Sequence, residues 1–158
     1  MSYEWVLCFH ILIYFFTSRY IPVHDVTERL GPSVAKALPA FHALTGCDTT
    51  SAFFGKGKKS AWSIWQNFPD LTLPLESLSS PDVTQEIVTA HMPVFQKFVM
   101  MLYGVFEDNI ATVDDARCFL FINKGKDFHH MPPSSDALYQ HMLRVAYQVM
   151  MITHSCIM

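Results

Sequence analysis

The sequence lacks closely spaced cysteine pairs. Its four cysteines, Cys8, Cys47, Cys118 and Cys156, lie far apart and form no Cys-x-x-Cys motif. Because structural zinc sites are usually built from such pairs, the spacing argues against one. Four cysteines in 158 residues are also too few for the disulfide framework of a small secreted domain. We therefore expect an intracellular protein, nuclear or cytoplasmic, with reduced thiols.

Charged residues are scarce, and basic ones are not in excess. Lysine and arginine number 11 against 14 acidic residues, which leaves a formal charge of −3. Nucleic-acid binding through a globally positive surface is therefore excluded, and any such binding needs a local patch. The composition is 51% hydrophobic and 14% aromatic, which excludes a disordered chain. So much apolar surface on one small domain also indicates a missing partner or missing chain.

No apolar run is long enough to cross a bilayer as a helix, which needs about 20 residues. The run from Trp5 to Phe16 is interrupted only by His10, and no basic residue precedes Arg19. We expect no membrane association. Its β-branched and aromatic residues favour a buried strand, with a short helix or a targeting segment as alternatives. We divide the chain into a divergent apolar segment, 1–18, and a single helical domain, 19–158.

The remainder of the chain has mostly helical periodicity, with no internal repeat. Apolar residues recur at helical spacing between proline and glycine breaks, which predicts a mainly α protein with one or two strands near the N-terminus. We expect Asp25 to cap the first helix, Pro39 to kink or restart the second, and Pro93 to divide the fourth. Gly31-Pro32 is predicted to end the first helix and Pro69 the third, and the second carries Val34, Ala37, Leu38, Phe41 and Leu44 at helical spacing. Residues 70–80 are predicted to be a loop or short turn. The predicted helices are 26–30, 34–44, 58–68, 82–102, 113–122 and 135–152.

A glycine- and lysine-rich turn lies near the middle of the chain. Gly55, Lys56, Gly57, Lys58 and Lys59 open the predicted helix 58–68. Free amides at a helix start, together with the helix dipole and lysine charge, suit a phosphate group. Contacts of this kind are made to the nucleic-acid backbone and do not read base sequence. The alternative is a solvated basic turn. The spacing is not that of a Walker loop.

A lone carboxylate, Asp48, precedes this turn and is followed by three hydroxyl residues. An acid beside a phosphate site predicts a ligand for Mg²⁺ or Mn²⁺, which prefer oxygen donors. The alternative is a capping residue that closes its own turn through Thr50 and Ser51. Both interpretations remain open from the local sequence.

Two adjacent motifs resemble a nuclease signature. The segment 44–48 (Leu-Thr-Gly-Cys-Asp), followed by 55–61 (Gly-Lys-Gly-Lys-Lys-Ser-Ala), resembles that of flap-endonuclease and XPG-type PIN-like nucleases. The wider stretch 19–153 resembles uncharacterised, often transposon-associated animal proteins with the same His-Ala-Leu-Thr-Gly-Cys-Asp-Thr-Thr core. The resemblance implies the helical C-terminal part of a PIN-like α/β domain with a helix-hairpin-helix-like element. It also implies that Asp48 is a metal ligand and that Gly55 to Lys59 contact DNA.

The chain departs from that family in its carboxylates. Only Glu4, Asp25 and Glu28 precede Asp48, whereas two-metal hydrolysis needs several acids converging on ions about 4 Å apart. We therefore assign no catalytic residue and expect a nuclease-derived, inactive fragment that binds nucleic acid. Two alternatives are an active metal-dependent endonuclease and a structural module without a nucleic-acid role. The structural module would dock its apolar helices, 86–102 and 138–152, on a protein partner or on the missing half of the protein.

Histidine and aromatic side chains offer weaker candidates. His42, His129 and His130 are candidate ligands or general bases, although a histidine beside an apolar helix is usually part of the core. The pairs Phe53-Phe54 and Trp62/Trp65 are candidates for stacking on bases, although their helical spacing is more typical of a core. Cys47 is expected to be a small buried residue.

Overall fold

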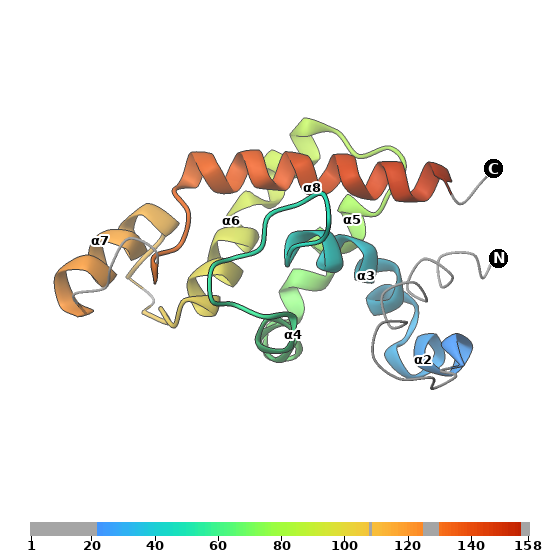
Figure 1. Ribbon diagram of the computed structural model, residues 1–158, viewed down its shortest axis with the longest axis horizontal. Helices are drawn as coiled ribbons and strands as arrows, with labels where there is room; N and C mark the ends of the chain where they lie inside the picture. Colours follow the sequence, from blue (N-terminus) through green and yellow to red (C-terminus); the bar gives the residue numbers. More distant parts are fainter. Residues whose placement is uncertain (1–21, 108, 125–129, 156–158) are drawn as a thin grey trace.

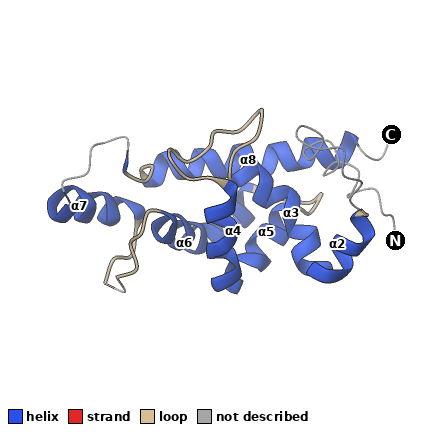
Figure 2. Ribbon diagram, turned by 60° about the horizontal axis from the view of Figure 1, so that its bottom comes forward, coloured by secondary structure: helices blue, strands red, loops and turns tan. Residues whose placement is uncertain are grey.

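The fold is helical throughout the part of the chain that the structure describes. The computed structural model describes residues 22–107, 109–124 and 130–155. These ranges contain helices and loops but no strand (Figure 2). The prediction of a mainly α protein is therefore confirmed. The strand predicted within Val6 to Phe16 falls outside the described residues.

Glycine and proline separate the first two helices. Gly31 has a φ of 78°, which side chains disfavour, and Pro32 takes the first position of the next helix, where its missing N–H is not needed. The first helix begins at Val23 rather than after Asp25, so that Asp25 lies in the first turn instead of capping it. The helices are α2 (Val23–Leu30), α3 (Pro32–Leu44), α4 (Lys58–Asn67), the 3-10 helix η1 (Pro69–Leu71), α5 (Thr72–Leu78), α6 (Gln85–Leu102), α7 (Val113–Lys124) and α8 (Ser135–Ser155).

Helix α8 is the long element against which the centre of the molecule packs. It runs along the longest axis of the molecule and contacts α3, α5 and α6 (Figure 1). Its buried face meets fully buried side chains of the other helices, including Phe95, Phe98 and Leu44. Full burial of such a side chain stabilises the fold by roughly 1.5–3 kcal/mol. Helices α3 to α8 therefore share one core, and α2 lies beside α3 at one end.

The loop predicted for residues 70–80 is wrong. Most of this segment lies in η1 and α5, and Leu71, Leu75 and Leu78 are fully buried. Their spacing of four and three residues places them on one helical face. Pro74 lies in the first turn of α5, where its missing N–H costs no helical hydrogen bond.

The prediction that Pro93 divides its helix is also wrong. Helix α6 continues from Gln85 to Leu102 with Pro93 inside it and exposed to solvent. An interior proline costs about 3 kcal/mol. Burial of Met92 and Phe95 on the inner face offsets that cost. Helix α3 likewise includes Pro39.

The apolar stripes of α6 and α8 face the interior of the chain. The buried residues of both helices belong to the shared core, and the two helices contact each other. The docking faces predicted on 86–102 and 138–152 are thus largely occupied by the chain itself. Large apolar side chains remain exposed on α7, where Phe121 and Ile122 are 58% and 76% exposed. No helix in the described ranges is both long and apolar enough to cross a membrane.

Candidate phosphate-binding site

Gly46 lies near the start of the segment between α3 and α4, in a backbone conformation that any other residue would adopt only with strain. Gly46 has a φ of 99°, and a Cβ at this position would lie 2.6 Å from the Cβ of Ala52. Thr45 precedes it, is buried, and donates its hydroxyl to the Phe41 carbonyl at 2.8 Å. The close approach of residues 46 and 52 folds the start of the segment against the end of α3.

Thr50 closes the turn that follows. Its buried hydroxyl donates to the Ala43 carbonyl at 2.6 Å and accepts from the Cys47 backbone N–H at 3.2 Å. Cys47 and Thr50 also exchange backbone hydrogen bonds of 3.1 and 3.3 Å. Asp48 is exposed, and its carboxylate makes no hydrogen bond among the described contacts. The predicted turn is therefore present, but Thr50 closes it rather than Asp48.

Lys58 lies at the C-terminal end of α3 although it belongs to the first turn of α4. Its Nζ donates to the His42 carbonyl at 3.0 Å, the Thr45 hydroxyl at 2.9 Å and the Gly46 carbonyl at 2.6 Å. An ammonium group has three protons, and these contacts use all three. A cation here also complements the negative end of the α3 dipole. Lys58 therefore joins the start of α4 to the end of α3.

Burial and charge shift the pKa values around Lys58. Burial lowers the pKa of Lys58, against a smaller raising effect of Cys47. Burial also lowers the pKa of His42, Lys58 lowers it further and Asp48 raises it, which leaves a value of about 4. His42 is therefore neutral near pH 7, and Asp48 lies within electrostatic range of it.

Cys47 is a half-buried free thiol in the same cluster. Burial raises its pKa, but hydrogen bonds from Thr49 and Thr50 lower it by more, so the pKa lies below its ordinary value. The hydroxyl oxygens of Thr49 and Thr50 lie 3.3 and 3.1 Å from its sulfur. The sequence-based expectation of a small buried residue is therefore only partly met.

The N-terminus of α4, unlike the turn at residues 47–50, is not closed by side-chain hydrogen bonds. Gly57 is its N-cap residue and no side chain caps the helix, while the Ser60 hydroxyl donates to the Gly57 carbonyl at 2.8 Å. A Cβ at Gly55 or Gly57 would meet nothing within 4 Å. The first turn contains no acidic residue, and Lys59 is exposed. The first N–H groups of a helix lack helical acceptors, so this end presents donors and positive charge together.

The turn lies at the end of a long loop. Residues 45–57 separate α3 from α4, so Gly55 to Lys59 do not form a short hairpin between the two helices. Lys56 places its Nζ 4.9 Å from the centroid of the Tyr103 ring. Of the three lysines in the predicted contact, Lys58 is thus engaged with α3, Lys56 lies over an aromatic ring, and Lys59 extends from the open helix start.

The described residues surround Asp48 with no cluster of metal ligands. Within these ranges, no three His, Cys, Asp or Glu side chains cluster in a way that could hold a metal ion. Asp114 and Asp115 are engaged elsewhere. Asp115 accepts from the backbone N–H and hydroxyl of Thr112 at the start of α7, and Asp114 accepts from the N–H of Ser135. Among the described residues Asp48 therefore belongs to no such cluster, and Mg²⁺ or Mn²⁺ binding stays a prediction.

Of the aromatic residues predicted as candidates for base stacking, some are buried in the core and one is exposed. Trp65 is buried, stacks on Phe41 at 4.8 Å and donates its ring N–H to Thr72 at 3.0 Å, and Trp62 packs edge-on against both rings. Phe53 is also buried, whereas Phe54 is 59% exposed. The tryptophans therefore belong to the core. His130 lies edge-on to Phe54 at 5.5 Å, and His129 falls outside the described residues.

His141 is an important residue that the sequence pattern did not reveal. It is buried in α8, and its Nε2–H donates to the Leu44 carbonyl at 2.9 Å. Burial lowers its pKa, a hydrogen bond to Leu44 raises it and Arg144 lowers it, with a net lowering. His141 thereby attaches α8 to the last turn of α3, a contact across 97 residues that no local signal predicts.

Comparisons with known protein families, with curated proteins and with solved structures find no match to this chain.

Proposed function

We propose that this chain binds the phosphate backbone of nucleic acid through the turn from Gly55 to Lys59. The observation that carries the proposal is the open start of α4, which has no side-chain cap, no acid in its first turn and an exposed Lys59. Amides at such a helix end bind phosphate oxygens, and lysine adds charge at the same point. The overall charge of −3 confines the attraction to this local patch.

In this proposal two of the three lysines contact phosphate and the third holds the turn in place. Lys59 contacts the phosphate directly, and Lys56 supplies a second ammonium from its position over Tyr103. Lys58 directs its three protons to α3 and holds the turn in place. Backbone binding of this type is indifferent to base sequence and weakens as salt rises.

The proposed origin is the C-terminal part of a PIN-like nuclease that no longer cleaves. Residues 44–48 and 55–61, which carry the resemblance, lie next to each other because Lys58 joins them. Cleavage through two metal ions needs several converging carboxylates. In the described ranges Asp48 has no such neighbours. Binding without hydrolysis is the activity that these residues support best.

A salt series tests the proposal. Duplex and branched DNA are titrated with the wild type, with the double variant Lys56→Ala/Lys59→Ala, and with Arg29→Ala as a control for loss of charge on α2. The double variant should bind more weakly and reduce the slope of log K against log salt by about 1.5–2, since each phosphate contact contributes roughly 0.9. Arg29→Ala should match the wild type. Absence of binding at low salt, or an unchanged slope in the double variant, would contradict the proposal.

A protein-binding role is the second candidate, and the end of α7 favours it. Phe121 and Ile122 expose most of their apolar surface there. Exposed apolar surface marks interaction sites where it forms a contiguous patch. If this is the function, Phe121→Ser/Ile122→Ser should abolish partner capture from cell extract while DNA binding stays unchanged.

A further inference from the structure

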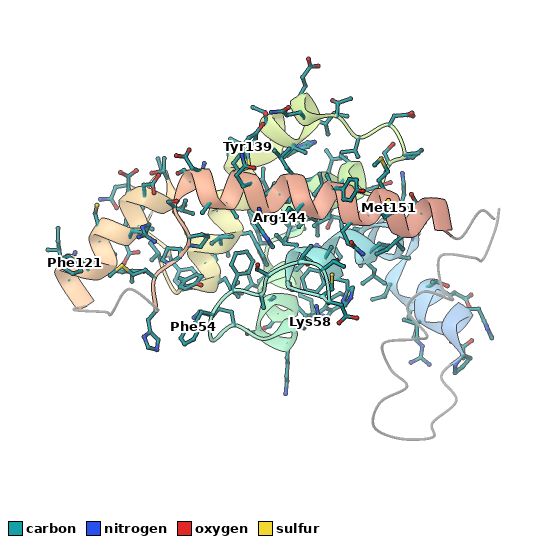
Figure 3. The ribbon with its side chains drawn as sticks, turned by 45° about the horizontal axis from the view of Figure 1, so that its top comes forward. Phe54, Lys58, Phe121, Tyr139, Arg144 and Met151 are labelled. Atoms are coloured by element: carbon teal, nitrogen blue, oxygen red, sulfur yellow. The ribbon has the colours of Figure 1, made fainter. Side chains whose placement is uncertain are left out.

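A cleft lies directly beside the proposed phosphate site. Its volume is about 290 Å³, close to the lower end of the roughly 300–1,000 Å³ of small-molecule sites. Phe53 and Phe54, the two residues before Gly55, form one side of it. Tyr103, which follows α6, and His141 and Arg144 of α8 also line it. Figure 3 shows Arg144 on the side of α8 that faces the loop bearing Phe54.

The walls of the cleft are aromatic and held in place. Phe53 is buried and lies edge-on to the His141 ring at 5.4 Å. Burial raises the pKa of the Tyr103 hydroxyl, and a hydrogen bond with the Phe54 backbone lowers it, which places that backbone beside the hydroxyl. Phe54 itself is 59% exposed. The cleft thus combines fixed rings with one ring at its solvent edge.

The charge around the cleft is positive. Among the described residues, no aspartate or glutamate lines it, and Arg144 makes no hydrogen bond or ion pair. The Lys56 ammonium lies over the Tyr103 ring at its edge. A guanidinium with free donors beside apolar rings suits a ligand that combines a planar ring with an anionic group.

We propose that this cleft receives an unpaired nucleobase of the strand whose phosphate lies on Gly55 to Lys59, and that Arg144 contacts the neighbouring phosphate. This inference rests on the proposed function. Phe54 stacks on the base at the solvent edge, and the adjacency of Phe54 to Gly55 places base and phosphate at neighbouring positions of one strand. Stacking requires an exposed ring face, which paired bases inside a duplex do not offer. The preferred substrate class is therefore single-stranded nucleic acid or an unpaired end.

The test compares two oligomers with equal numbers of phosphates. A labelled dT 12-mer and an abasic 12-mer are titrated at low salt with the wild type, with Phe54→Ala and with Phe121→Ala, an exposed phenylalanine on α7 that serves as the matched control. The wild type should bind the dT oligomer about tenfold more tightly than the abasic one. Phe54→Ala should bring this ratio close to one while abasic binding is retained. Phe54→Tyr and Phe121→Ala should keep the wild-type ratio.

A second variant addresses Arg144. Arg144→Gln should weaken both oligomers and reduce the salt slope by about 0.7, the contribution of one phosphate on a single strand. Folding of each variant is checked by its thermal unfolding.

The outcomes separate the base cleft from the phosphate contact. Equal binding of both oligomers by the wild type, with salt dependence intact, would overturn the base cleft and leave the phosphate contact standing. A dT preference unaffected by Phe54→Ala would place the base elsewhere and also overturn it. Absence of binding to every oligomer would remove both proposals. Preferential binding of an acidic peptide in place of the dT oligomer would assign the cleft to a protein partner.

Discussion

The two halves of the central segment have opposite characters. Residues 45–50 are tied to α3 by the hydroxyls of Thr45 and Thr50 and by the close approach of Gly46 to Ala52. Residues 55–59 leave a helix start uncapped, with open space around both glycines. Lys58 joins the halves by reaching back to α3. Gly46 and Lys58 thus serve the structure, whereas Gly55, Gly57 and Lys59 remain available to a ligand.

The glycines should show this contrast most strongly. Gly46→Ala places a methyl group 2.6 Å from the Ala52 Cβ at a positive φ and should lower the free energy of unfolding by about 2–4 kcal/mol. Gly57→Ala has space and an ordinary φ, and should cost less than about 1 kcal/mol through poorer capping. Urea unfolding measures both. Equal losses in the two variants would contradict the difference between the halves.

Substitution of Lys58 should affect mainly the stability of the fold, and substitution of Lys59 mainly DNA binding. Lys58→Met removes three hydrogen bonds at the end of α3 and should lower the free energy of unfolding by about 1–2 kcal/mol. Lys59→Met should change stability by less than about 0.5 kcal/mol and weaken DNA binding instead. Urea unfolding and DNA titration of both variants check this. If Lys58→Met unfolds like the wild type, its contacts do not hold the turn.

Acid should destabilise the segment through His42. Its folded pKa of about 4 lies below the ordinary 6.5, so the unfolded chain binds more protons between these values. Stability is therefore complete above about pH 6.5 and falls as the pH drops toward 4. Because the ring is partly exposed, solvent screening limits the loss to about 1 kcal/mol. Urea midpoints at pH 7 and pH 5 measure it.

The His42→Gln variant isolates this contribution. It should flatten the pH dependence, and the slope that remains belongs to His141, whose pKa burial also lowers. An identical pH dependence in the wild type and the variant would exclude His42 as the cause.

Asp48 should have the smallest effect. Asp48→Asn should change the free energy of unfolding by less than about 0.5 kcal/mol, because the carboxylate is exposed and Thr50 closes the turn. Incubation of wild type and variant with branched DNA and Mg²⁺ or Mn²⁺ should give no cleavage. Metal-dependent cleavage that the variant loses would support the active-endonuclease alternative.

Local sequence signals predicted most helices but not all of their boundaries. The spacing of Val34, Ala37, Leu38 and Leu44 identified α3, and Pro69 correctly marked the end of α4. The failures at residues 70–80 and at Pro93 have a common cause. Local sequence does not show which side chains the shared core buries, and that burial stabilises both helices. At Pro93 it also outweighs the cost of an interior proline.

The sequence predicted where the candidate site lies, but not which of its residues hold the structure and which can bind a ligand. The glycines and the lysine run mark a turn before α4, and that turn is present. The partners of Lys58 lie 12 to 16 residues earlier in the chain, and Arg144 reaches the cleft from the last helix. Contacts at such separations depend on how the helices pack, which local patterns do not encode.

The sequence by itself determined the helical class, the breaks at Gly31 and Pro69, and the turn at Gly55 to Lys59, because periodicity and backbone freedom are local properties. The tertiary structure alone decided that Lys59 rather than Lys58 extends from the helix start and that Phe54 rather than Phe53 faces solvent. It also decided that Asp48 belongs to no cluster of three metal-ligating side chains among the described residues. Those outcomes follow from the packing of α8 and α4 around the end of α3, where Thr50, Lys58 and His141, distant from one another in sequence, each bond to carbonyl groups of the same few residues.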